Sequence, residues 1–273
     1  MPELPEAETI VRDLARQVTG RRIESVEVLR PDILAPGTSP STFSRTLRGR
    51  IIEGVSRRGK NVVLELSDLR LVINLGMTGR VVTEDPGKPG PWRHVAVRFE
   101  LSGGRRLLYD DARRFGRLEL MDENGWRQRD SELGIEPLSR EFTPARLHEL
   151  TSRSRTPIRN WLLDQRRVAG VGNIYANEAL FRARIRPDRP ASSLDQRDAR
   201  RLRDAIRDVL SEAIDKRGTT ISDYRDGNGE TGGFEPWLRV YGREGQPCRR
   251  CRTPIERLVL SNRSAFYCPK CQQ

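Results

Sequence analysis

The spacing of hydrophobic residues changes along this chain from helical to strand-like and back to helical. In residues 5–18, apolar side chains recur at helical spacing, at Ile10, Val11, Leu14 and Val18. Gly20 follows at the position where a C-terminal cap belongs. We therefore predict one amphipathic helix at the start of the chain.

After this helix, short apolar segments are separated by Gly and Pro clusters such as DPGKPGP. The clearest segment covers residues 95–101, where Val95, Val97, Phe99 and Leu101 alternate strictly with other residues. Similar segments are Val26 with Val28, residues 62–66, residues 69–75, and Leu118 with Leu120. Several short strands separated by turns predict a β-sandwich or barrel.

Helix start signals appear from about residue 140 onward. Thr143-Pro144 and Thr156-Pro157 each resemble an N-cap followed by proline at the first helical position. Ser193 with Gln196 resembles a capping box ahead of an apolar helical pattern at Leu202, Ile206, Val209 and Ala213. The Gly-rich stretch RDGNGETGGFEPW then shows no periodicity, and we predict a long functional loop there.

These patterns predict an α+β chain with a β-rich first part and a helical second part. A chain of 273 residues is also of the size at which single hydrophobic cores usually give way to two domains. We expect the boundaries to give 1–138 as an N-terminal β-sandwich, 139–240 as a helical domain with the loop, and 241–273 as a small cysteine-containing module.

The charge balance favours a polyanionic partner. The chain has 50 Lys and Arg against 38 Asp and Glu, which gives a formal net charge of +12. Nucleic acid is the leading partner, and an anionic membrane surface is the competing one. No stretch approaches the ~20 apolar residues of a spanning helix, and no apolar signal segment follows Met1. We expect a soluble cytoplasmic protein that is not secreted and binds no membrane.

All four cysteines lie near the C-terminus as two C-x-x-C pairs: Cys248 with Cys251, and Cys268 with Cys271. Sixteen residues separate the pairs, a spacing typical of a zinc ribbon in which four thiolates hold one structural Zn²⁺. Two disulfides are the alternative, but they fit poorly with a reducing compartment. Between the pairs, IERLVLSNRSAFY predicts a hairpin with Arg263 near its turn. Arg263 could probe a nucleic-acid groove or be a solvated turn residue.

A second candidate for nucleic-acid contact is the Gly-rich passage in DQRRVAGVGNIYANEALF, which runs from Val168 to Asn173 between two short helical segments. Helices joined by tight turns present backbone N–H groups to a phosphate, and Asn173 lies at that joint. The alternative is a plain helix hairpin punctuated by glycine. The neighbouring Arg166 and Arg167 favour the phosphate interpretation.

The first residues, MPELPE, allow an ordinary interpretation on their own. Pro5 suits the first turn of a helix, and Glu6 and Glu8 suit the positive end of its dipole. Without other information, this helix-start interpretation is favoured.

Taken together, however, the motifs resemble the formamidopyrimidine-DNA glycosylase family, bacterial enzymes that remove oxidised purines from DNA. The motifs that carry the resemblance are MPELPE, RRGKNVVLEL, LGMTGR, DDARRFG, DQRRVAGVGNIYANEALF, RGTTISDY, VYGREGQPC and the four cysteines. They follow the family's order over essentially the whole chain. The resemblance implies a helix-two-turn-helix in the second domain, one structural zinc, and damaged duplex DNA as the partner of a monomer.

The resemblance also gives the N-terminus a chemical role. In the family, Met1 is removed and Pro2 becomes the nucleophile. A terminal amine has a pKa near ~8, whereas lysine has a pKa near ~10.4, so a larger fraction of the terminal amine is free base at neutral pH. Its secondary amine yields a cationic iminium with C1′ of the sugar, which drives elimination of both phosphates. Glu3 is implied to protonate the opening sugar. Glu6 is implied to help bind the damaged nucleotide, with helix capping as an equal alternative.

Other residues match the family's DNA contacts. The resemblance implies that Lys60 binds the phosphate beside the lesion. An enzyme that extrudes a base must also fill the gap, and Met77, Arg113 and Phe115 match the gap-filling residues, although Met77 and Phe115 could instead be core residues. We group Pro2, Glu3, Lys60 and Arg263 as the catalytic set, and Met77, His94, Arg113, Phe115 and Asn173 as the DNA-binding set.

The loop after the long helix matches the family's lesion-binding loop, which closes over the extruded base through backbone amides. Its matching residues here are Thr219, Thr220, Ser222 and Tyr224. Three positions depart from the family pattern: Asn74 replaces histidine, Ala112 replaces proline, and Arg217 replaces the first of two glycines. The change at Arg217 leaves the exact base preference open.

Two other functions remain open at this point. A zinc-ribbon DNA-binding protein without catalysis would account for the charge and the cysteines but gives MPELPE no role. An endonuclease VIII-like glycosylase acting on oxidised pyrimidines is the alternative within the enzyme class, and MPEL with RGTTISDY favours the purine enzyme.

Overall fold

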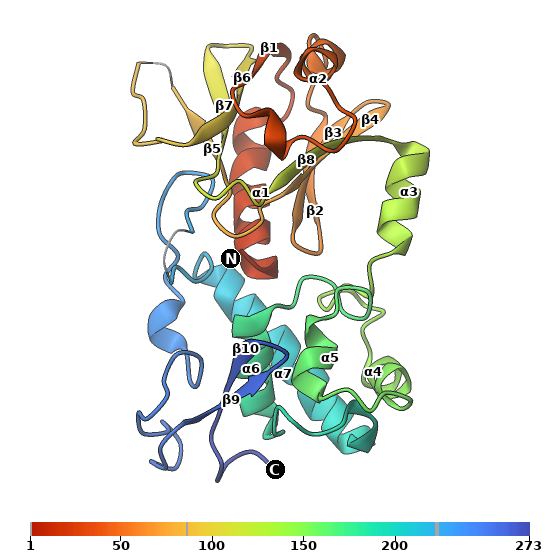
Figure 1. Cartoon of the computed structure of the whole chain (residues 1–273), viewed down its shortest axis with the longest axis vertical. Coiled ribbons are helices and arrows are strands. Elements are labelled where there is room, and N and C mark those ends of the chain that lie inside the picture. The colour runs from red at the N-terminus through yellow and green to blue at the C-terminus, as the bar shows by residue number, and fades with distance from the viewer. Residues whose placement is uncertain (1, 86, 222–223) are drawn as a thin grey trace. The chain divides into compact units, whose positions relative to one another are not determined.

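The computed structural model describes residues 2–85, 87–221 and 224–273, which form two compact units (Figure 1). The first unit contains Met1–Ser131 and Lys216–Gly233, and the second contains Glu132–Asp215 and Phe234–Gln273. The segment Lys216–Gly233 thus belongs with the N-terminal residues, although it follows the last long helix of the second unit. The domain boundaries expected near residues 138 and 240 stay a prediction.

The first unit is built on two antiparallel sheets with helix α1 (Leu4–Val18) against them. One sheet has the order β1-β6-β7-β5, and the other has the order β2-β3-β4-β8. Their bounds are Ile23–Val28 (β1), Gly54–Arg58 (β2), Asn61–Leu66 (β3), Leu69–Asn74 (β4), Arg80–Glu84 (β5), Val95–Leu101 (β6), Arg105–Asp110 (β7) and Arg117–Asp122 (β8). The predicted β-sandwich is confirmed.

A continuous hydrophobic core explains why these elements fold together. Helix α1 contributes three fully buried residues to this core: Ile10, Leu14 and Val18. The same core contains Val62 and Leu64 of β3, and Phe99 and Leu101 of β6. The helical spacing of the α1 residues therefore reflects burial of one face of the helix. The alternation in β3 and β6 likewise reflects burial of one face of each strand. The helix ends at Val18, and Gly20 follows in the left-handed region.

Several elements of this unit were not predicted. They are β2, β5, β7, and two helices, α2 (Pro40–Leu47) and α3 (Glu123–Ser131). Strand β2, with the sequence GVSRR, is half-buried throughout and lacks a clear apolar alternation. Helix α3, ENGWRQRDS, has no buried residue among its nine, so no apolar stripe marks it.

The second unit is helical and ends in a β-hairpin. Its elements are α4 (Pro144–Thr151), α5 (Ile158–Leu163), α6 (Asn173–Ala183), α7 (Gln196–Asp215), β9 (Glu256–Leu260) and β10 (Arg263–Tyr267). The predicted helices and the hairpin between the cysteine pairs are confirmed. Among the described residues, no helix is both long enough and apolar enough to cross a membrane.

The predicted helix starts of this unit are only partly right. Thr143 caps α4 as expected, because its side chain accepts a hydrogen bond from the amide of Arg146. The prediction at Thr156 is wrong by one residue, since Pro157 holds the N-cap position of α5. The Ser193–Gln196 capping box is also wrong. Instead, Asp195 accepts a hydrogen bond of 2.7 Å from the Asp198 amide at the start of α7.

Candidate active site and nucleic-acid interface

The start of α1 brings two buried carboxylates together. Glu3 and Glu6 are 2% and 1% exposed, and Pro2 beside them is buried. Glu6 Oε2 accepts a hydrogen bond of 2.8 Å from the Glu3 amide, within a capping box that satisfies the free N–H groups at the helix start. The helix-start interpretation of Glu6 is therefore confirmed. It does not exclude the second role, because Glu6 has another oxygen.

That second oxygen contacts the segment Lys216–Gly233. Glu6 Oε1 accepts a hydrogen bond of 2.8 Å from the backbone amide of Thr219. Gly218 lies in the left-handed region at φ +82°, and a Cβ there would lie 2.9 Å from Glu6 Oε1. Glycine is thus required for this close approach. One carboxylate thus joins the amide of Glu3 to the amide of Thr219. The lesion-binding role of Glu6 stays a prediction.

Lys60 lies half-buried in the turn between β2 and β3. Arg57, which lies in β2 just before this turn, fixes the turn in place. Its Nε bonds to Glu8 of α1 at 3.0 Å, and its Nη1 donates to the carbonyl of Gly59 at 2.8 Å. Arg57 thereby connects the Lys60 turn to helix α1, which follows directly after Pro2 and Glu3. Sequence reasoning missed Arg57, because nothing distinguishes it from the neighbouring arginines except this partner.

Met77 and Phe115 lie on two loops of the first unit and are 39% and 58% exposed. Both exposures rule out the alternative that these side chains belong to the core. The two loops are in direct contact. Gly76, at φ +56°, has room only for hydrogen, because a Cβ there would lie 2.5 Å from the backbone of Phe115. The Arg113 guanidinium lies 4.6 Å from the centre of the Phe115 ring.

One buried carboxylate, Asp111, fixes both loops. Its Oδ1 accepts from the hydroxyl of Thr78 at 2.5 Å and from the amide of Arg113 at 3.3 Å. Its Oδ2 accepts from the Gly116 amide at 2.9 Å and from the Tyr109 hydroxyl at 3.1 Å. Asp111 is 1% exposed and thus sets the backbone beside Met77, Arg113 and Phe115. Sequence reasoning missed it, and the only available signal was a pair of acidic residues directly after an apolar segment.

Two of the positions that depart from the family pattern, Asn74 and Ala112, lie near these loops. Asn74 lies at the base of the Met77 loop, where its side chain donates to Asn61 at 2.8 Å and accepts from the Gly76 amide at 3.0 Å. Ala112 is exposed, so it has no packing role to lose. His94 is also exposed, and its amide donates to Asp110 at 2.7 Å.

The lesion-loop residues take different positions. Thr219 is 3% exposed, and the Thr220 hydroxyl accepts from the Gly232 amide at 2.8 Å. Tyr224 is buried in the core of the first unit, and burial raises the pKa of its hydroxyl far above the usual value. Its ring therefore anchors the loop, and any contact of Tyr224 with a base has to come from its backbone. Ser222 lies outside the described residues.

In the second unit, Asn173 is the first residue of α6 and belongs to a polar network with the hairpin. Its side-chain amide donates to the Ser264 carbonyl at 3.1 Å. Arg159, which is fully buried, donates to Asn173 Oδ1 at 2.7 Å and to the carbonyls of Ser264 and Leu260 at 2.8 and 3.2 Å. Burial, and secondly the charge of Arg263, lower the pKa of Arg159 to about 10. Sequence reasoning missed Arg159.

This network fixes the hairpin turn that carries Arg263. Leu260 and Arg263 pair across the turn, and the guanidinium of Arg263 is exposed. The predicted position near the turn is confirmed. By contrast, Arg166 and Arg167 both pair with Asp164, at 2.9 and 3.3 Å. Their charge is partly neutralised within the unit, so the case for phosphate binding depends on Asn173 and the helix start.

The four cysteines form a site that fits zinc. Their four Sγ atoms lie within 4.8 Å of one another, with Cys248 and Cys268 buried and Cys251 and Cys271 half-buried. Four sulfurs at about 2.3 Å from a tetrahedral Zn²⁺ would lie about 3.8 Å apart. Cys251 and Cys268 are 3.4 Å apart, whereas a disulfide needs about 2.05 Å. The prediction of a four-thiolate zinc site is confirmed, and the disulfide alternative is wrong.

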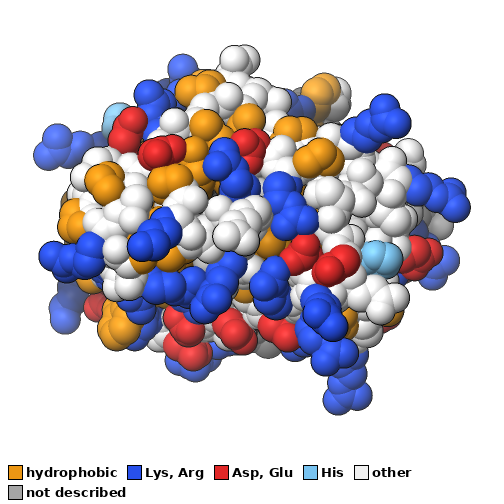
Figure 2. Space-filling model, turned by 90° about the horizontal axis from the view of Figure 1, so that it is seen from below, with side chains coloured by type: hydrophobic (Ala, Val, Ile, Leu, Met, Phe, Trp, Pro, Cys, Tyr) orange, Lys and Arg blue, Asp and Glu red, His pale blue; other side chains and the backbone are white. Residues whose placement is uncertain are grey.

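Charge alone does not locate the nucleic-acid interface. On the face shown in Figure 2, Lys and Arg side chains are spread widely, with Asp and Glu side chains between them. Many arginines also form ion pairs with carboxylates, as Arg182 does with Glu212 at 2.7 Å. The candidate interface is therefore defined by the specific loops described above.

Three family models match consecutive parts of the chain. They are described as the formamidopyrimidine-DNA glycosylase N-terminal domain (residues 1–118), the formamidopyrimidine-DNA glycosylase H2TH domain (residues 133–225), and a zinc finger found in FPG and IleRS (residues 245–273). Together these matches cover most of the chain, including the four cysteines and the start of α1.

Individual proteins agree with these models over their full length. A formamidopyrimidine-DNA glycosylase of Chloroflexus aurantiacus is 44% identical over 100% of this chain and 98% of its own. A variant of the Lactococcus lactis enzyme, solved with DNA containing Fapy-dG, superposes with a TM-score of 0.92 at 33% identity over 100% of both chains. The same enzyme, solved with DNA containing an abasic site, gives a TM-score of 0.91 at 33% identity over 99% of both chains.

Proposed function

The chain belongs to the formamidopyrimidine-DNA glycosylase family, and on this premise we propose how its own residues perform the reaction. It is a DNA glycosylase with abasic-site lyase activity that removes oxidised purines from damaged duplex DNA. Full-length relatives that are formamidopyrimidine-DNA glycosylases favour the purine enzyme over a non-catalytic zinc-ribbon protein and over an endonuclease VIII-like enzyme. One structural Zn²⁺ belongs to the four cysteines and stabilises the hairpin that carries Arg263.

We assign the nucleophile to the nitrogen of Pro2 once Met1 has been removed. The free secondary amine attacks C1′ of the damaged nucleotide, and the bond from C1′ to the base breaks. Glu3 donates a proton to the sugar ring oxygen as the ring opens. The resulting iminium accepts electrons as a proton leaves C2′ and the 3′ phosphate departs, and a second elimination releases the 5′ phosphate. Water then hydrolyses the iminium and regenerates the amine.

The remaining residues bind and orient DNA in this proposal. Lys60, held by the Arg57 contact to α1, binds the phosphate beside the lesion as a point charge. Met77, Arg113 and Phe115 enter the space left by the extruded base, which requires the exposure that they have. His94 contacts DNA near these loops. In the second unit, Asn173 and Arg263 bind the DNA backbone and groove.

The observation that carries this assignment is the position of Glu6. Its carboxylate accepts from the amide of Glu3 and from the amide of Thr219, so the catalytic residues and the lesion-binding loop share one buried contact. We further propose that the enzyme works as a monomer in the cytoplasm, associated with the chromosome.

A Glu3→Gln variant tests the division of roles. Glutamine keeps the size of the side chain but cannot donate the proton, so excision of an intact oxidised guanine should be nearly abolished. Cleavage at a preformed abasic site should persist, because that sugar already equilibrates with its open aldehyde. Glu24→Gln, at an exposed position on β1, is the matched control. Equal loss of both activities in Glu3→Gln would contradict the assigned role.

A further inference from the structure

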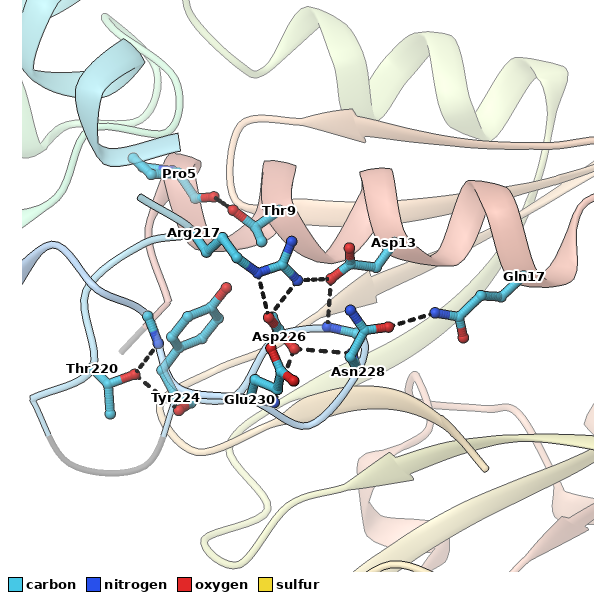
Figure 3. A network of polar contacts seen from close by, with 12 residues as sticks. Pro5, Thr9, Asp13, Gln17, Arg217, Thr220, Tyr224, Asp226, Asn228 and Glu230 are labelled. Atoms are coloured by element: carbon cyan, nitrogen blue, oxygen red, sulfur yellow. Dashed lines mark hydrogen bonds and ion pairs between the residues drawn. The ribbon is translucent and has the colours of Figure 1, made fainter. Parts of the chain in front are cut away.

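Arg217 joins the segment Lys216–Gly233 to helix α1 through two buried carboxylates (Figure 3). Its Nη2 donates to Oδ2 of Asp13 at 2.6 Å, and its Nε donates to Oδ2 of Asp226 at 2.7 Å. The side chains of Asp13 and Asp226 are only 4% and 0% exposed. Removing the partner of a buried carboxylate is strongly destabilising, so the Arg217 guanidinium supports both of them.

The carboxylates extend the contact along both elements. Asp13 also accepts from the amide of Gly227 at 3.2 Å, and a Cβ on Gly227 would lie 2.6 Å from the Asp13 Cβ. Asp226 Oδ1 accepts from the amides of Asn228 and Glu230, each at 2.9 Å, which closes the turn at the end of the segment. The Asp13 carboxylate thus fixes the position of this turn on α1.

A third contact continues the same face of the helix. Gln17, one turn after Asp13, donates to the side chain of Asn228 at 2.7 Å. Figure 3 shows Thr9, Asp13 and Gln17 on successive turns of α1, with the side chains of Arg217 and Asn228 directed toward this helix. Residues four apart lie on one helix face, so α1 offers a continuous polar strip to this segment.

The backbone of Arg217 lies in a conformation that is unfavourable for a residue other than glycine. Arg217 has φ +62°, in the left-handed region that costs a residue other than glycine about 1 kcal/mol or more. A glycine, which the family pattern has here, would avoid this cost. Burial by itself would lower the pKa of Arg217. The hydrogen bonds to Asp226 and Asp13 have the larger combined effect, so the pKa lies above its ordinary value. The two ion pairs therefore compensate for an unfavourable backbone conformation.

The fixed backbone leads directly to the active site. Gly218 and Thr219 follow Arg217, and the Thr219 amide donates to Glu6, whose other oxygen accepts from the Glu3 amide. We propose that the Arg217–Asp13–Asp226 cluster is a positioning device, which holds the lesion-binding segment on α1 so that Thr219, Glu6 and Glu3 keep their relative positions. This inference rests on the proposed function, and it makes Arg217 a positioning residue for excision of the damaged base.

The main test is an Arg217→Gly variant. Glycine suits φ +62°, which offsets part of the cost of removing both ion pairs. We expect single-turnover excision of an oxidised guanine opposite cytosine to fall on the order of tenfold to a hundredfold, as misplacement of catalytic groups typically costs. Cleavage of a preformed abasic site should stay close to wild type, because no base has to be held. Arg217→Lys should recover part of the loss, and Arg16→Ala, at an exposed position on α1, is the control.

A second measurement does not depend on activity. Hydrogen exchange at the amides of residues 218 and 219 should accelerate in Arg217→Gly, because the Thr219 amide loses its fixed position against Glu6. Equal losses of excision and abasic-site cleavage, or unchanged excision with unchanged exchange, would overturn the inference. If the wild-type protein itself lacked both activities, the proposed function would fail instead, and the exchange measurement would still decide whether Arg217 holds the segment.

Discussion

Replacing Asp111 should disturb the two loops of the first unit that carry Met77 and Phe115. This buried carboxylate accepts hydrogen bonds from Thr78, Tyr109, Arg113 and Gly116. Asp111→Ala removes the shared acceptor, whereas Asp111→Asn keeps the volume and replaces one oxygen with a donor. The two variants therefore separate the loss of the contacts from the loss of the charge.

The expected loss in the free energy of unfolding depends on which of the four donors can find another acceptor. The Gly116 amide and the Tyr109 hydroxyl are buried, and a buried donor without a partner costs about 1–3 kcal/mol. The Thr78 hydroxyl can rotate, and the Arg113 amide also donates to the Thr78 hydroxyl oxygen at 3.1 Å. We therefore expect Asp111→Ala to lower the free energy of unfolding by about 2–6 kcal/mol. Asp111→Asn should cost about 1–3 kcal/mol, since one oxygen remains.

Denaturant unfolding followed by circular dichroism measures the stability loss, and excision kinetics measure the functional one. Excision should slow in Asp111→Asn even where the protein is fully folded, because the backbone beside Met77 and Phe115 is no longer fixed. Asp68→Ala, which removes an exposed partner of Arg50, is the control and should change the stability little, because water screens an exposed ion pair. An Asp111→Ala variant as stable as this control would refute the reasoning.

Three further outcomes are expected. Metal analysis should find one zinc per chain, and Cys268→Ala should remove it; zinc retained in that variant would contradict the assignment. Arg263→Ala should weaken binding to damaged and undamaged duplex by similar factors, whereas selective loss for the damaged duplex would place Arg263 at the lesion. Burial, and then Asp111, raise the pKa of the Tyr109 hydroxyl, so its contribution to stability is full below about pH 10 and is lost as the pH rises further. Tyr109→Phe should flatten this alkaline loss in unfolding experiments, and an unchanged pH profile would contradict it.

The sequence predicts the elements whose residues alternate between core and solvent. Helix α1, strand β6 and helix α7 were recognisable because one face of each is buried. Strand β2 and helix α3 could not be recognised, since neither carries an apolar face. The cysteine pairs were informative because metal geometry restricts their spacing.

The hydrogen bonds that position the site residues could not be predicted from such sequence patterns. Arg57 and Arg159 are ordinary charged residues in the sequence, and their roles depend on partners 49 and 105 positions away. Asp111 bonds to close neighbours as well as to Thr78, 33 positions away, and no pattern marks its burial. Arg217 was visible as a departure from the family pattern, but its partner Asp13 is 204 positions away. Long-range hydrogen bonds leave no periodic trace, so these residues emerge only from the fold.

The central claim, that Pro2 is the nucleophile, is tested most directly by borohydride trapping on a duplex with 8-oxoguanine opposite cytosine. Protein lacking Met1 should form a covalent complex, and peptide sequencing should locate the cross-link at Pro2. Protein with an uncleaved N-terminal tag has an amide at this nitrogen, so it should bind the duplex but neither excise nor trap. A tagged protein that excises and traps normally would contradict the claim and direct attention to another amine, with Lys60 the first to examine.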